Sequence, residues 1–159
     1  MNKEKNNIIL IYACFIFSLL LISLPLMSVQ LLGHILFFTI IIAAYYYRCK
    51  SDDSSLIKNH MTYFVKSFWI SSLALLVGII FAAFLSDNTL IHNIVDSFTS
   101  GILLSKHEMN IVLMQYARKN IIVLLLTISP SIIYLFYRII KGMILANKNQ
   151  FIPNLKSWL

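Results

Sequence analysis

The sequence predicts an all-α integral membrane protein whose four helices cross the bilayer as a bundle. Charged residues make up 12% of the 159-residue chain and apolar residues 59%, whereas soluble domains carry about 25% charged residues. Four long stretches contain no Asp, Glu, Lys or Arg. A charge-free stretch that spans the hydrocarbon must satisfy its backbone hydrogen bonds internally, as a helix does. The helices of a soluble bundle would show a polar stripe, which these stretches lack.

The four expected spans belong to one integral membrane domain over residues 1–159. They cover residues 8–26, 31–47, 67–85 and 120–137. With 17 to 19 residues each, they reach roughly 25–29 Å as helices, close to the thickness of the hydrocarbon core. Only four residues join the first two spans, so these spans are expected to form an antiparallel hairpin.

The segment 86–119, between the third and fourth spans, is expected to contain helix on the outer side of the membrane. Five of its apolar residues recur at helical spacing and share one face: Leu90, Ile91, Ile94, Val95 and Phe98. This pattern favours an amphipathic helix on the membrane surface, with an ordinary packed helix in an external loop as the alternative. Ser105 and Glu108 fit a capping box, so another helix is expected to start there and run unbroken into the fourth span.

The basic residues predict that both termini are cytoplasmic. Ten of the thirteen lie on one side of the expected spans: Lys3, Lys5, Arg48, Lys50, Lys58, Lys66, Arg138, Lys141, Lys148 and Lys156. The other side has Lys106, Arg118 and Lys119. Because cytoplasmic loops are enriched in Lys and Arg, this distribution indicates a multi-pass protein of a bacterial cytoplasmic membrane. Small basic groups at span ends are unlike a nucleic-acid-binding face, so no nucleic-acid partner is expected.

The side chains most able to carry chemistry gather at the expected cytoplasmic interface. This candidate cluster comprises Arg48, Asp52, Asp53, His60, Tyr63, Lys66, Trp69, Arg138 and Lys141. If the connection before the third span continues into it as a helix, then His60, Tyr63 and Ser67 share one face.

Two roles for the acidic residues of this cluster follow from their position. Asp52 or Asp53 could pair with Arg138 or Lys141 across the bundle, which would set the register of the helices. His60 with the two carboxylates could instead bind a metal. One histidine seven residues after an acidic pair is a weak pattern for that purpose, so the sequence predicts no catalytic, cofactor or metal site.

Two motifs near the inner ends of the last two spans resemble those of a known family. The first is Asn59-His60 followed by Lys66-Ser67-Phe68-Trp69, and the second is Tyr137-Arg138-Ile139-Ile140-Lys141-Gly142. They resemble the Ser-His, Arg-Thr-Phe-Trp and Tyr-Arg-x-x-Lys-Gly signatures of an uncharacterised bacterial family of small polytopic membrane proteins. Residues 59, 66 and 67 keep the residue type of the family but not its identity. The resemblance implies the fold and topology and carries no activity.

Three functions are compatible with these patterns. The first is a non-enzymatic accessory or assembly component, whose partners would be lipid, other membrane proteins or further copies of the chain. It draws on charge-free spans, on a basic tail over residues 141–156 and on the small-residue pair Ala74 and Gly78, which could mediate helix contact. The alternative is a small oligomeric transporter or channel. The third is a lipid-modifying enzyme at the membrane interface that uses His60 with Asp52 or Asp53.

Overall fold

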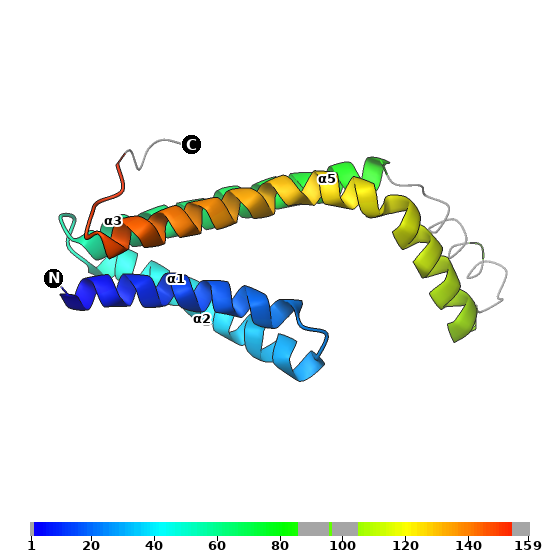
Figure 1. Cartoon of the computed structure of the whole chain (residues 1–159), viewed down its shortest axis with the longest axis horizontal. Helices are drawn as coiled ribbons and strands as arrows, with labels where there is room; N and C mark the ends of the chain where they lie inside the picture. Colours follow the sequence, from blue (N-terminus) through cyan, green and yellow to red (C-terminus); the bar gives the residue numbers. More distant parts are fainter. Residues whose placement is uncertain (1, 86–95, 97–104, 154–159) are drawn as a thin grey trace. The chain divides into compact units, whose positions relative to one another are not determined.

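The computed structural model describes residues 2–85, 96 and 105–153, and these residues form helices and no strand. The long helices are α1 (Asn2–Ser23), α2 (Met27–Lys50), α3 (Leu56–Leu85) and α5 (Lys106–Asn147) (Figure 1). Each contains a stretch long and apolar enough to cross a membrane. The predicted all-α class with four membrane-spanning helices is therefore confirmed. The apolar face expected over residues 90–98 lies outside the described residues.

The helices extend beyond the charge-free runs, because the width of the hydrocarbon limits a span but not the helix that contains it. α3 begins at Leu56 rather than at residue 67. α5 begins at Lys106 and runs unbroken to Asn147, which confirms the helix start expected after Ser105. α1 is the exception, since it ends at Ser23 rather than at residue 26. Pro25 explains the early end, because the residue before a proline is disfavoured in the α conformation.

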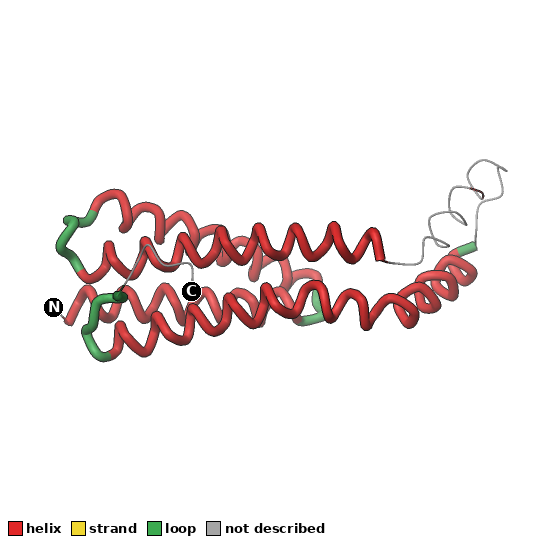
Figure 2. Tube along the Cα trace, turned by 90° about the horizontal axis from the view of Figure 1, so that it is seen from above, coloured by secondary structure: helices red, strands yellow, loops and turns green. Residues whose placement is uncertain are grey.

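The chain divides into two compact units, and α3 and α5 contribute residues to both. Unit 1 comprises Met1–Ser71 with Tyr134–Leu159, and unit 2 comprises Ser72–Ile133. All ten basic residues assigned to the inner side fall in unit 1, and the other three fall in unit 2. Within unit 1, the N-terminus, the α2–α3 connection and the end of α5 lie at one end of the helices (Figures 1 and 2).

The interior of unit 1 is an aromatic and aliphatic cluster to which all four long helices contribute. Its most deeply buried members are Ile8, Tyr12 and Phe15 of α1, Ala44 of α2, Met61 and Phe64 of α3, and Ile139 and Ala146 of α5. The Phe15 ring lies 5.0 Å from the Phe64 ring and 5.3 Å from the Phe37 ring, measured between centroids. These distances are typical of favourable aromatic pairs.

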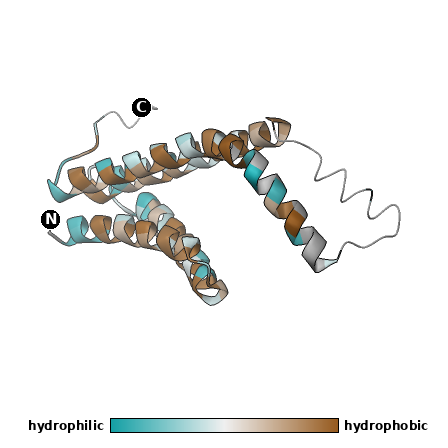
Figure 3. Ribbon diagram, turned by 45° about the vertical axis from the view of Figure 1, so that its right-hand side comes forward, coloured by the Kyte–Doolittle hydropathy of each residue, from teal (hydrophilic) through white to brown (hydrophobic). Residues whose placement is uncertain are grey.

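Apolar side chains also cover the outside of the helices. Leu10, Phe38 and Leu126 are each at least 60% exposed, and hydrophobic residues run along the helices while hydrophilic ones gather at the N-terminal end of α1 (Figure 3). An apolar exterior of this extent indicates that the outer surface of the helices faces lipid.

The expected α1–α2 hairpin is present, but its connection is formed by residues 24–26, and residues 27–30, where the connection was expected, are the first turn of α2. Gly33 of α2 lies against α1, where a Cβ atom would sit 2.9 Å from the backbone nitrogen of Ile22. Only glycine allows the two backbones to approach this closely, as in other membrane helix pairs.

A second close approach joins α3 and α5 inside unit 2. A Cβ atom on Gly78 would sit 2.3 Å from the carbonyl oxygen of Thr127. Ala82, one turn further along α3, is buried, whereas Ala74 is exposed. Of the small-residue pair noted in the sequence, Gly78 therefore lies in the α3–α5 contact, whereas Ala74 lies on the surface of α3. Ala74 and Ala82 are both four residues from Gly78, so only the rotation of α3 determines which of them is buried.

Candidate functional site

The first three turns of α3 position the central residues of the candidate cluster. Because α3 begins at Leu56, the connection before the charge-free run is helical. His60, Tyr63 and Ser67 are all buried on one face of it. The shared face expected from their spacing is thus confirmed.

Arg138 of α5 reaches this face and is only 3% exposed. Its Nε donates a hydrogen bond to Ser67 Oγ over 3.0 Å, and Ser67 Oγ donates to the carbonyl of Tyr63 over 2.7 Å. The guanidinium carbon lies 3.9 Å from the centroid of the Tyr63 ring and 5.6 Å from that of Tyr134. Aromatic faces attract a cation most strongly where water is excluded. These contacts tie α3 to α5 and stabilise the buried charge.

His60 is completely buried between α1 and the segment that follows α5. Its Nε2 lies 3.0 Å from the carbonyl oxygen of Gln150, and the hydroxyl of Tyr12 donates to the carbonyl of His60 over 3.3 Å. A carbonyl oxygen only accepts, so Nε2 carries the hydrogen of that bond. Among the described residues, His60 Nδ1 and the Tyr63 hydroxyl are buried without a hydrogen-bond partner.

The segment after α5 turns back onto α3 through a Schellman motif. Asn149 adopts a positive φ of 54°, and its amide donates to the carbonyl of Ala146 while that of Gln150 donates to Leu145. This is the pattern of a helix that ends in a left-handed residue, a position that asparagine tolerates.

Asn59 holds the returning segment by two reciprocal bonds. The amide of Ile152 donates to Asn59 Oδ1 over 2.8 Å, and Asn59 Nδ2 donates to the carbonyl of Ile152 over 3.4 Å. The Ile152 side chain is buried. The part of the basic tail that follows α5, residues 148–153, is therefore held against α3 at Gln150 and Ile152. We call residues 148–153 the return segment.

Asn59→Leu is expected to release the return segment, because it removes both bonds to Ile152 and keeps a side chain of similar size. The loss of the net free energy of two hydrogen bonds should raise the exchange rate of the Ile152 amide about tenfold or more. Hydrogen exchange with mass spectrometry measures that rate, and tryptic cleavage after Lys148 should accelerate with it. Asn6→Leu, on an exposed position of α1, is the matched control and should change neither. Unchanged exchange at Ile152 in Asn59→Leu would contradict this assignment.

The acidic residues of the cluster lie apart from Arg138. The carboxylate of Asp53 is 2.5 Å from Lys58 Nζ and almost fully exposed, so its expected pairing with Arg138 or Lys141 is wrong. The reason is local: α3 starts three residues after Asp53, which brings Lys58 in its first turns within reach. Asp52 is exposed, and its carbonyl accepts bonds from the amide and hydroxyl of Ser55.

The hydrogen bond and charge of Lys58 hold the pKa of the Asp53 carboxyl below its ordinary value. A lowered pKa in the folded state means that the pair contributes stability above the ordinary carboxyl pKa. That contribution is lost as the pH falls through the lowered pKa. Lys58→Gln should return the pKa of Asp53 to its ordinary value, which a carbon-13 titration of the carboxyl would report. Identical Asp53 titrations in both proteins would refute the pairing.

The remaining cluster members lie on the outside of unit 1. Arg48 is exposed and Lys66 is half-buried. Trp69 is largely exposed and its indole donates to the hydroxyl of Tyr45. Lys141 Nζ lies 5.6 Å from the Tyr137 ring centroid. The nine predicted residues thus separate into a buried group of His60, Tyr63 and Arg138 and six half-buried or exposed side chains, and the structure does not bring them together in one site.

Sequence reasoning missed Tyr12, Asn59 and the return segment as parts of the buried group. Asn149 offers the one readable signal, since asparagine often ends a helix in the left-handed conformation. Asn59 and Ile152 are 93 residues apart, and no local pattern marks their contact.

The fold and the buried group define the class of the protein, a polytopic helical membrane protein with a packed interior at the basic end of its helices. Within the described ranges 2–85 and 105–153, no three His, Cys, Asp or Glu side chains lie close enough to hold a metal. Comparisons with protein-family models, curated proteins and solved structures give no match for this chain.

Proposed function

We propose that the chain is a non-enzymatic accessory or assembly component of a membrane complex. The observation that carries this proposal is the use of the polar side chains in unit 1. Arg138, Ser67, His60 and Asn59 all bond to other helices or to the return segment. Groups used in this way hold a scaffold together, and their burial keeps them from a substrate.

The geometry disfavours a lipid-modifying enzyme built on His60. The histidine is 0% exposed, because α1 and the return segment cover it. Asp53 pairs with Lys58 at the surface instead of orienting the imidazole. A general base must come within hydrogen-bond reach of the proton that it abstracts, and a lipid cannot approach this ring.

The packing of unit 1 also disfavours a transport path through a single copy. Tyr12, Phe15, Met61 and Phe64 fill the space between α1 and α3, each with at most 2% of its surface exposed. A path for a polar solute would need polar groups along a continuous opening. The alternative function, a transporter or channel, is compatible with this packing only if the path forms between several copies of the chain.

The decisive experiment extracts the tagged protein in its native lipid and combines mass spectrometry of the sample with the particle mass. The proposal expects a second protein in fixed stoichiometry, with a particle mass equal to that of the complex. An unrelated tagged four-helix membrane protein, expressed equally, is the control for adventitious capture. A homo-oligomer without a second protein would contradict the proposal and make flux into liposomes the next assay.

We also propose that the basic end of unit 1, which carries the N-terminus, the α2–α3 connection and the end of α5, faces the cytoplasm of a bacterial cell. We propose further that the chain belongs to the uncharacterised family whose motifs it resembles. Ten basic residues in unit 1 against three in unit 2 support this orientation.

Cys49 provides a direct test of orientation, because it is exposed at the basic end of α2. In a Cys14→Ser background it is the single thiol of the chain. A membrane-impermeant maleimide should leave it unlabelled in intact cells and label it after permeabilisation. Equal labelling in intact cells would place the basic end outside and reverse the proposed topology.

A further inference from the structure

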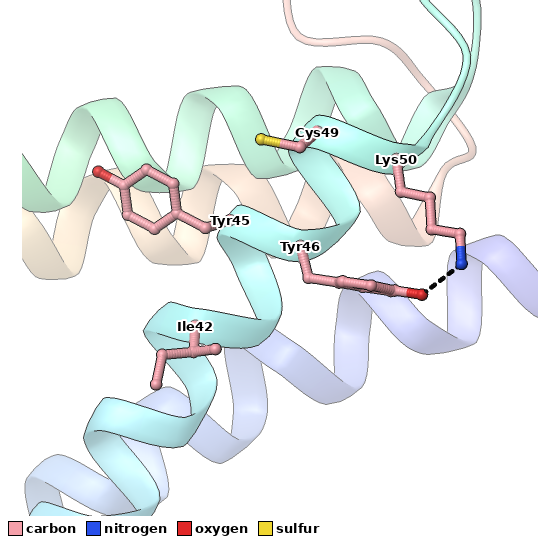
Figure 4. Close-up of a pocket in the computed structure, with 5 residues that line it drawn as sticks. All are labelled: Ile42, Tyr45, Tyr46, Cys49 and Lys50. Carbon is pink, nitrogen blue, oxygen red and sulfur yellow. Dashed lines mark hydrogen bonds between the residues drawn. The ribbon is translucent and has the colours of Figure 1, made fainter.

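The last two turns of α2 present a shallow hollow on the outside of unit 1. It is lined by Ile42, Tyr45, Tyr46, Cys49 and Lys50 (Figure 4). Spacings of three, four, seven and eight residues place all five on one helical face. Ile42 is 68% and Tyr46 54% exposed, so the face is open to whatever surrounds the protein.

Two contacts order the polar side chains of this face. Lys50 Nζ donates to the hydroxyl of Tyr46 over 2.7 Å and lies 5.1 Å from the centroid of the same ring (Figure 4). The hydroxyl of Tyr45 accepts a bond from the Trp69 indole of α3. The ammonium is therefore held beside the tyrosine hydroxyl, and the neighbouring ring is fixed to a second helix.

The face changes from apolar to basic along the axis of a membrane-spanning helix. Ile42 and Lys50 are eight residues apart, which is about 12 Å along α2. α2 is one of the four candidate spans, and Lys50 is its last residue. The Ile42 end thus lies toward the acyl chains and the Lys50 end toward the headgroups.

We propose that this face binds an anionic phospholipid, with the phosphate at Lys50 and Tyr46 and an acyl chain along Ile42 and Tyr45. An ammonium has three hydrogens, so the bond to Tyr46 leaves donors for a phosphate oxygen. The tyrosine hydroxyl accepts from Lys50 and can donate its own hydrogen to the same phosphate. The exposed Arg48, two residues before Lys50, adds positive charge at the same end. Lipid binding at this face does not depend on the proposed assembly role.

Charge complementarity distinguishes this occupant from a neutral lipid. The five lining residues include one cation and no acidic side chain, so a net negative headgroup gains more from the site than a zwitterionic one. The mixed aromatic and basic composition also suits the headgroup boundary, where tyrosine places its ring in the apolar layer and its hydroxyl in the polar layer.

The test uses the full chain in nanodiscs with equal amounts of phosphatidylglycerol and phosphatidylcholine, followed by native mass spectrometry of the retained lipid. The wild-type chain should retain phosphatidylglycerol preferentially. Lys50→Gln should lower that preference about fivefold, the factor associated with one basic residue at an anionic surface. Tyr46→Phe, which keeps the ring and removes the hydroxyl, should lower it less, and Lys50→Arg should preserve it.

Lys141→Gln is the matched control. Lys141 also lies over the ring of a tyrosine four residues before it, Tyr137, in α5 of the same unit. It is outside the hollow, so its substitution should leave the preference nearly unchanged. Equal losses in Lys50→Gln and Lys141→Gln would show that total charge attracts the lipid, and this would overturn the proposal. A wild-type protein that retains both lipids equally would overturn it as well.

Discussion

Phe15→Ala is expected to lower the free energy of unfolding by about 3 kcal/mol. Phe15 is fully buried, and its ring contacts Phe37 of α2 and Phe64 of α3. Truncation of a buried phenylalanine in a soluble core costs about 3–5 kcal/mol. The lower end of that range applies here, because lipid is as apolar as the removed side chain and the loss is mainly one of packing.

Reversible unfolding in mixed micelles of increasing dodecyl sulfate fraction, followed by circular dichroism, measures this loss. Phe17→Ala is the matched control, since Phe17 lies two residues away on the exposed face of α1. Its substitution should change the free energy of unfolding by less than about 0.5 kcal/mol. Equal destabilisation by the two substitutions would contradict the aromatic cluster as the core of unit 1.

Gly78→Ala is expected to destabilise the packing of α3 against α5 by about 2 kcal/mol. The added methyl group would lie 2.3 Å from the carbonyl oxygen of Thr127, well inside van der Waals contact. The obstacle is backbone, so the helices must move apart to accept it. Overpacking of a close contact typically costs about 1–3 kcal/mol.

The same micelle titration tests this prediction, with Ala74→Leu as the control. Ala74 lies one turn before Gly78 and is exposed. A much larger side chain there should be accommodated by lipid at a cost below about 0.5 kcal/mol. If Ala74→Leu were more destabilising than Gly78→Ala, the assignment would be contradicted and Ala74 would have to lie in the α3–α5 interface.

Local sequence patterns predicted the four long helices of this protein and the hairpin formed by the first two. Charge-free runs located the four helices, because a backbone in lipid must bond within its own segment. The capping box of Ser105 and Glu108 predicted the start of α5, and the shortness of the connection between the first two spans predicted the first hairpin, although that connection lies at residues 24–26. Helical spacing also placed His60, Tyr63 and Ser67 on one face. Each of these predictions depends on residues within a few turns of one another.

Contacts between helices depended on information that the local pattern does not contain. The helices are apolar on nearly every side, so hydrophobic periodicity does not mark which face turns inward. The sequence therefore did not show that Gly78 is buried against α5 while Ala74, one turn earlier, is exposed. The pairing of Asp53 was wrong because its position relative to Lys58 depends on where α3 begins, eleven residues before the charge-free run.

The sequence by itself determined the number of spans, their helical state and the concentration of basic residues at one end. Only the tertiary structure decided that Arg138 contacts Ser67, 71 residues away, and that the return segment closes over His60. Such contacts depend on the rotation and register of whole helices. The rotation and register of a helix are determined jointly by many residues that are far apart in the sequence, so no single segment predicts these contacts.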